Sequence, residues 1–386
     1  LNGFISAGNA PKYADGSKLR YSTSVTFTAS NGEWYENTYG YDPGVPYDVE
    51  IANNTTASFG TVGFPREMRG SLTITPGSTF ELSTAAGGDL FIKGNIYNNG
   101  TFNAKGREVK FNGTTNQEIH GTITFDYMRI ENSAGVTINS AADVTVTKRI
   151  SITSGTLNTN NNLTLEDGAA LMHGAGTPDG GGNVSGNVKI KRAGSSNSIV
   201  FNLWGSPVQN APVSILGSNV FYYDETLNNA DYRDDWVPAS GTLVVGKGYA
   251  ASGAGTVTFN GVVNDGNFNI PITSTGSGAE DGWNLIANPY PSAVDADQFI
   301  SANSGKLVGG ALYFWDDPGS GQNNFTTADY ATYNILGGVA GGGGNTPNGF
   351  IGSGQSFFIK SANPSTTVSF NNTMRSDNNS QFFRQG

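Results

Sequence analysis

The chain has no cysteine and only two histidines among its 386 residues. The lack of cysteine excludes disulfides, thiolate chemistry and cysteine-ligated zinc. No apolar run is long enough to span a bilayer, so we expect no membrane span. The net charge of −10 argues against nucleic acid and anionic membranes as partners, because an acidic surface repels phosphate groups.

Glycine and aromatic residues are abundant, with 54 Gly, 22 Phe, 16 Tyr and 5 Trp. Disordered chains usually combine few aromatics with high charge, whereas here only 13% of the residues are charged. Asn, Thr and Ser are also enriched. This composition is typical of polar β-structure interrupted by glycine, and it predicts an all-β protein.

Residues 47–172 are dominated by short apolar–polar–apolar triplets separated by Gly and Asn. Period two places both apolar side chains of a triplet on one face. The clearest triplets begin at Val49, Leu72, Phe80, Val109, Val136, Val144, Ile150 and Leu163. Such short strands at close spacing favour a right-handed parallel β-solenoid over residues 46–182, with an antiparallel sandwich as the alternative. Before it, residues 1–45 are expected to be irregular apart from one strand at 21–28.

A glycine-rich stretch at residues 174–182 predicts a domain boundary. After it, four blocks recur in the same order, which indicates an internal duplication. The paired blocks are Phe201-Asn-Leu-Trp204 with Trp283-Asn-Leu-Ile286, Tyr222-Tyr-Asp-Glu225 with Phe314-Trp-Asp-Asp317, Gly246-Lys-Gly-Tyr249 with Gly354-Gln-Ser-Phe357, and Val257-Thr-Phe-Asn260 with Val368-Ser-Phe-Asn371. Residues 183–386 are therefore predicted to form a duplicated β-sandwich-like module, with copies at about 195–275 and 280–375 and a C-terminal tail.

The phrase Gly282-Trp-Asn-Leu-Ile-Ala-Asn-Pro-Tyr-Pro-Ser292 closely resembles one found in large secreted surface proteins of the Bacteroidetes. The order of the duplicated blocks, and repeats such as Ser154-Gly-Thr-Leu-Asn158, are similar to the same proteins. The resemblance implies export by the type IX secretion route and an extracellular or cell-surface location. It brings no catalytic residue with it. It also implies that the chain is a processed fragment of a longer precursor.

Catalytic groups do not form a recognisable set. His120 and His173 are predicted to lie exposed at corners, without the acid and nucleophile that a catalytic triad needs. The neighbouring carboxylates Asp224/Glu225, Asp234/Asp235 and Asp316/Asp317 point to opposite faces if they lie on strands, so they do not make an acid–base pair by themselves. A non-enzymatic protein is expected.

Two kinds of binding site remain as candidates. Oxygen-rich loops in the two copies predict calcium, which prefers several oxygen ligands, although no EF-hand spacing is present. The calcium candidates are Asp224, Asp231, Asp234, Asp235, Asp316, Asp317 and Asp329. Aromatic side chains that stack on sugars would give a glycan site instead. The glycan candidates are Tyr222, Tyr232 and Trp236, together with Tyr35, Tyr39 and Tyr41.

Taken together, the sequence predicts a secreted structural or adhesive protein, with the solenoid as a stalk. Unpaired strand edges at the ends of a solenoid favour self-association, and contacts between terminal strands would give head-to-tail filaments. In that hypothesis the tail at residues 377–386, which contains Phe382 and Phe383, joins one copy to the next. The alternative function is binding or degradation of a surface or matrix polysaccharide.

Overall fold

The structure is a computed structural model that describes residues 9–35, 43–227, 235–317 and 326–383. It is all-β, as the composition predicts. The chain divides into two compact units, and each unit consists of two separate stretches of the sequence. The first unit comprises Leu1–Leu165 and Asp179–Asn187, and the second comprises Glu166–Pro178 and Val188–Gly386.

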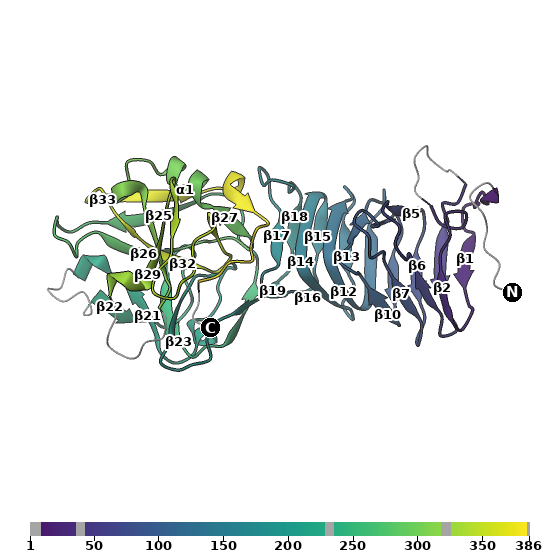
Figure 1. The fold of residues 1–386 in the computed structure, drawn as a ribbon, viewed down its shortest axis with the longest axis horizontal. Helices are drawn as coiled ribbons and strands as arrows, with labels where there is room; N and C mark the ends of the chain where they lie inside the picture. The colour runs from purple at the N-terminus through teal and green to yellow at the C-terminus, as the bar shows by residue number, and fades with distance from the viewer. Residues whose placement is uncertain (1–8, 36–42, 228–234, 318–325, 384–386) are drawn as a thin grey trace. The chain divides into compact units, whose positions relative to one another are not determined.

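The first unit is a parallel β-solenoid of about 6 turns, which confirms the prediction and excludes the antiparallel sandwich. Its strands follow one another as successive layers from β1 to β18 (Figure 1). One ladder contains β1 (Lys18–Tyr21), β3 (Asp48–Ile51), β6 (Leu72–Ile74), β9 (Ile96–Asn98), β12 (Gln117–Glu131), β13 (Val136–Ile138), β15 (Thr156–Asn158) and β18 (Asn183–Ser185).

Two further ladders complete the coils. One contains β2 (Thr26–Thr28), β4 (Thr56–Ser58), β7 (Thr79–Glu81) and β10 (Thr101–Asn103). The other contains β5 (Arg66–Met68), β8 (Leu90–Ile92), β11 (Glu108–Phe111), residues 127–130 of β12 and residues 149–152 of β14 (Asp143–Ser154). Residues 122–125 of β12 pair with residues 143–146 of β14, and β14 in turn pairs there with β16 (Leu163–Leu165). The long strand β12 takes part in three successive ladders and β14 in two, where the sequence predicts separate triplets.

The solenoid core is a stack of like residues in consecutive coils. Leu72 pairs with Ile96, and Ile96 pairs with Ile119 in the next coil. All three side chains are fully buried. The apolar triplet positions therefore form one continuous core, in which each coil buries the apolar face of its neighbour.

The single strand expected at residues 21–28 is wrong. The chain leaves β1 at Tyr21 and enters β2 at Thr26, so the two strands belong to different ladders. Between them Ser24 has a φ of 59°, a left-handed conformation that breaks an extended strand. Alternation of side chains alone could not reveal this corner.

The second unit repeats one strand arrangement twice, which confirms the internal duplication. The first copy contains β19 (Val188–Ala193), β20 (Phe201–Trp204), β21 (Val220–Tyr223), β22 (Trp236–Pro238), β23 (Tyr249–Ser252) and β24 (Thr256–Gly261). The second contains β25 (Phe268–Thr273), β26 (Trp283–Ala287), β28 (Leu312–Trp315), β29 (Tyr330–Asn334), β30 (Gly337–Val339), β32 (Ser356–Lys360) and β33 (Ser365–Phe370).

Equivalent strands occupy equivalent places. The sheet order is β20-β23-β21-β22 in the first copy and β26-β32-β28-β29-β30 in the second. In addition, β19 pairs antiparallel with β24, as β25 does with β33. The strand order places residues 268–273 at the start of the second copy, whereas the sequence comparison assigned them to the end of the first.

The remaining elements of this unit are β17 (Ala170–Met172), β27 (Ala293–Asp295), α1 (Ala296–Ala302), β31 (Phe350–Ile351) and β34 (Arg375–Ser376). Asp295 caps the N-terminus of helix α1, because its side chain accepts a hydrogen bond from the Gln298 amide. The helix buries Phe299, which stacks on Phe370 with ring centroids 4.5 Å apart. None of the helices in the described ranges is long and apolar enough to cross a membrane.

Arg375 is fully buried and ties the C-terminal segment to the Glu166–Pro178 segment of the same unit. Its guanidinium donates hydrogen bonds to the carbonyls of Leu171 at 2.6 Å and His173 at 2.7 Å, and to Ser292 Oγ at 3.0 Å. A buried guanidinium needs several hydrogen-bond acceptors. These bonds provide them and hold the two segments together.

Candidate functional site

An aromatic pocket of about 520 Å³ lies within the second unit, where strands of both copies converge. We call it the aromatic pocket. Its aromatic lining is formed by Tyr223 on β21, Trp236 on β22, Trp283 on β26, Tyr313 and Trp315 on β28, Tyr330 on β29 and Phe358 on β32. The volume lies within the range of small-molecule sites in proteins, about 300–1,000 Å³.

Phe358 is the floor of this pocket and is 6% exposed. Four of the other rings stand nearly perpendicular to it, at interplanar angles of 82–87° and centroid distances of 5.3–6.4 Å. These wall residues are Tyr223, Trp236, Trp283 and Tyr330. The walls are only half-buried, so aromatic surface is left open to a ligand.

The duplication explains how aromatics from two copies meet. Tyr223 and Trp315 occupy the same position in the paired blocks, and both line the pocket. On a strand, successive side chains point to opposite faces, so the preceding residue of each block points away. Phe314 accordingly packs in the core of the second copy, and Tyr222 contacts Lys247, whose Nζ is 3.3 Å from the ring centroid.

The rim of the pocket carries its polar groups, namely Glu280, Thr326 and Thr327. Glu280 is exposed and belongs to a loop that several side chains hold in place. Trp283 Nε1 donates to the Ala279 carbonyl at 3.1 Å, and Lys360 Nζ donates to the same carbonyl at 2.8 Å. The loop is therefore fixed next to the aromatic walls.

Glu225 fastens the two ends of the same loop. It is 5% exposed, and its Oε1 accepts hydrogen bonds from Thr275 N at 2.6 Å, Thr275 Oγ1 at 2.9 Å and Gly282 N at 2.9 Å. A carboxylate from the first copy thus orders the loop that precedes the first strand of the aromatic sheet in the second copy. Charge-assisted bonds of this kind are the stronger ones in proteins.

Two of the predicted calcium ligands, Asp235 and Asp329, hold residues of the pocket in place. Asp235 Oδ2 accepts a hydrogen bond from the Tyr223 hydroxyl at 3.1 Å. Asp329 Oδ2 accepts one from the Thr326 amide at 2.6 Å, in a capping box that shapes the turn at the rim. Burial, followed by Asp235 and then by Glu225 and Glu280, raises the pKa of Tyr223, so its hydroxyl stays protonated.

The other calcium candidates are also engaged or lie elsewhere. Asp224 Oδ1 accepts from Thr226, and both Asp316 oxygens accept from Asn345. Within the described ranges no three acidic or histidine side chains come together to hold a metal ion. Asp317 ends one described range, and Asp231 and Asp234 lie outside the described residues. Calcium binding stays a prediction.

Of the predicted glycan ligands that the structure describes, Trp236 is the one that lines the pocket. Tyr222 lies on the other side of β21, and Tyr35 packs edge-on against Phe64 with centroids 5.1 Å apart. Tyr39, Tyr41 and Tyr232 lie outside the described residues. Alignment of the two copies places Tyr223 and Trp315 at equivalent positions and could have indicated both residues. The sequence does not show that the sheets of the two copies meet at one pocket.

Neither histidine is an exposed corner residue, so that prediction is wrong. His173 is 3% exposed, and burial, followed by Arg375, lowers its pKa well below the usual range. His120 lies within β12, half-buried, and stacks on Tyr97 at a centroid distance of 4.6 Å. Its Nε2 is 2.7 Å from Glu118 Oε2.

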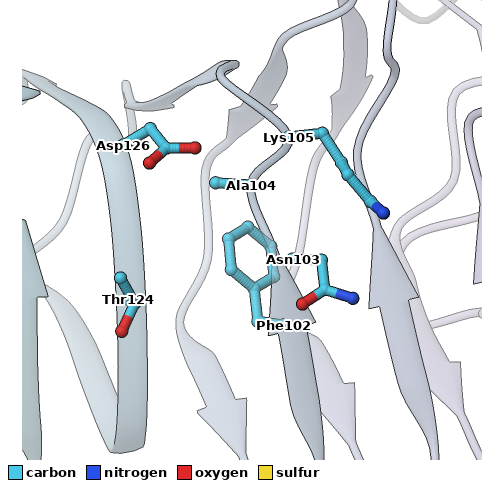
Figure 2. A pocket seen from close by; sticks show the side chains of 6 residues that line it. All are labelled: Phe102, Asn103, Ala104, Lys105, Thr124 and Asp126. Atoms are coloured by element: carbon cyan, nitrogen blue, oxygen red, sulfur yellow. The ribbon is translucent and has the colours of Figure 1, made fainter. Parts of the chain in front are cut away.

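A second hollow, of about 310 Å³, lies on the solenoid between β10 and β12. Its polar groups already have partners: Asp126 accepts from Gly106 N at 2.7 Å, and Asn103 donates to Glu81 at 2.9 Å. Lys105 pairs with Glu81 at 3.1 Å and extends away from Asp126 (Figure 2). With one aromatic ring, that of Phe102, and no converging polar groups, it is a weaker candidate than the aromatic pocket.

Comparison with known proteins places the chain in a family. A family model described as a domain of unknown function, DUF8693, matches residues 103–386, so the chain belongs to that family. The match includes the whole aromatic pocket and the later coils of the solenoid. No curated protein and no solved structure matches the chain.

Proposed function

We propose that the chain is a non-enzymatic extracellular surface protein that adheres to polysaccharide through the aromatic pocket, with the solenoid as a stalk. The observation that carries the proposal is the convergence of seven aromatic side chains on one open pocket. Half-buried rings rimmed by hydroxyl and carboxylate groups suit sugars, which present apolar C–H faces and polar edges.

The carboxylates of the described residues favour binding over hydrolysis. Glycoside hydrolysis generally uses two carboxylates facing one bond. Among the described residues that line the pocket, Glu280 is the one carboxylate, while Asp235 and Glu225 are engaged in hydrogen bonds that hold its walls and loop. The extracellular location rests on the resemblance to secreted surface proteins of the Bacteroidetes.

A glycan array and pull-down on insoluble polysaccharides test the proposal with the full chain. For a glycan that binds, Trp236→Ala should weaken affinity about tenfold or more, because truncating an aromatic anchor costs on the order of 2 kcal/mol. Tyr222→Ala is the matched control, since the adjacent ring lies outside the pocket. Binding should survive in that variant.

Two outcomes would overturn the proposal: no affinity for any polysaccharide, or equal binding by wild type and Trp236→Ala. Because Trp236 also packs on Tyr223 and Phe358, circular dichroism must first show that the variant is folded. Trp236→Phe, which keeps an aromatic ring, is expected to lose less affinity than the alanine variant.

A further inference from the structure

The charges around the aromatic pocket distinguish one class of glycan from others. Three carboxylates lie close to the pocket. The Tyr223 hydroxyl donates to Asp235 Oδ2 at 3.1 Å, Glu225 Oε1 accepts from the Gly282 amide at 2.9 Å, and Glu280 belongs to the lining. Glu225 and Asp235 are buried behind the wall, and Glu280 stands exposed at the rim. The pocket is thus apolar on its surface and negative in its surroundings.

Among the described residues, Lys360 is the cation that contacts an aromatic ring of the lining, and it lies at the edge of the pocket. Lys360 Nζ lies 5.5 Å from the centroid of Trp283 and is held by the carbonyls of Gly278 and Ala279. This contact places an ammonium group beside one of the wall rings, whose face attracts cations.

We propose that the aromatic pocket selects glycans that carry a protonated primary amine, such as polymers of glucosamine. This inference rests on the proposed function and specifies its ligand. The C–H face of the sugar ring would stack on the wall aromatics, while the ammonium pairs with the Glu280 carboxylate at the rim. The same carboxylates would repel uronic acids and sulfated sugars.

The test compares two trimers that differ only at the amine, together with one anionic oligomer. Tryptophan fluorescence and calorimetry of the full chain are followed with a glucosamine trimer, with the neutral N-acetylglucosamine trimer and with an oligomer of a uronic acid. At about pH 6 the glucosamine trimer should bind about tenfold more tightly than its acetylated counterpart, and added salt should reduce the difference. At about pH 9 the amine is largely neutral, and the difference should disappear.

Glu280→Gln isolates the charge at the rim. This change keeps the size of the side chain, and the Glu280 side chain is exposed, so the fold should be unaffected. The variant should lose most of its preference for the amine while its affinity for the acetylated trimer stays the same. Asp281→Asn is the matched control, because its carboxylate accepts from the Gly278 amide within the same loop and is not part of the lining.

The outcomes separate the two proposals. Equal affinity for amine and acetylated trimers, or an unchanged preference in Glu280→Gln, would overturn the amine selectivity and leave polysaccharide binding intact. Preference for the uronic acid would also overturn it. If no trimer binds and the glycan array is empty, polysaccharide binding itself fails, and the inference fails with it.

Discussion

At the scale of single residues, His173 is buried, although its sequence context indicates an exposed position. It follows an apolar strand and precedes a glycine-rich stretch, which is typical of an exposed corner. In the structure the Glu166–Pro178 segment is part of the second unit, and the His173 carbonyl accepts from the buried Arg375. A local pattern cannot reveal a partner 202 positions away in the chain.

The lowered pKa of His173 predicts that the second unit becomes less stable in mild acid. Below about pH 6.5 the unfolded chain takes up a proton that the folded chain refuses, so stability present above that pH is lost as the pH falls. The slope should approach about 1.4 kcal/mol per pH unit as the pH falls below about 6.5, until the imidazole of the folded chain also takes up a proton. Urea unfolding followed by tryptophan fluorescence measures it, since four of the five Trp lie in this unit.

His173→Gln is the control for this pH dependence, because it replaces the ring with a neutral side chain that does not titrate. The variant should be less stable than wild type near neutral pH but should show a flatter profile over the same interval. An equally steep profile in the variant would assign the pH dependence to carboxylates instead.

At the scale of secondary-structure elements, the solenoid depends on identical placement of apolar residues in successive coils. Ile119 on β12 lies between Ile96 of the preceding coil and Ile138 of the next, and all three are fully buried. Ile119→Ala should therefore destabilise the first unit by about 2–5 kcal/mol, since it leaves a cavity that both neighbours line. Hydrogen exchange of the amides in β9, β12 and β13 would report the loss.

Thr122→Ala provides the matched control on the same strand, because Thr122 is exposed. It should change exchange in β9 and β13 little. If Ile119→Ala and Thr122→Ala had the same small effect, the continuous core would not be what holds neighbouring coils together.

The sequence predicts single strands far better than it predicts which strands lie next to one another. Triplets such as Val49–Ile51 and Val136–Ile138 were recognised because period two is a local property, and the parallel solenoid followed from their spacing. The paired blocks likewise revealed the duplication. The aromatic pocket was missed except for Trp236, because it forms between β21, β22 and strands of the second copy. Whether Tyr222 or Tyr223 faces it depends on a register that only the fold defines.

At the scale of the whole molecule, the C-terminal tail is part of its own module as far as Phe383. Phe383 is 3% exposed and stacks on Phe314 with centroids 4.8 Å apart, and Phe382 lies 5.2 Å from Trp204. Asn379 accepts from Arg192 at 2.6 Å and from the Ser353 amide at 2.7 Å. The tail therefore contacts both copies within one chain, and its role in joining neighbouring chains stays a prediction.

Filament formation stays a prediction. Removing residues 377–386 would not test it cleanly, because the truncation would also remove buried contacts of the module. A point substitution gives a sharper expectation. Phe383→Ala should destabilise the second unit by about 3–5 kcal/mol, because it removes a buried ring from the core cluster.

Ser380→Ala, at an exposed position of the same tail, should leave the stability of the unit within about 0.5 kcal/mol of wild type. Unfolding in urea, followed through the tryptophans, separates the two variants. Electron microscopy under conditions where Phe383→Ala is still folded then addresses assembly. Fibres that disappear only in Phe383→Ala would mean that the tail acts between molecules. Fibres retained in both variants would place the contacts on other surfaces, such as the edge of β1, which pairs only with β3 among the described residues.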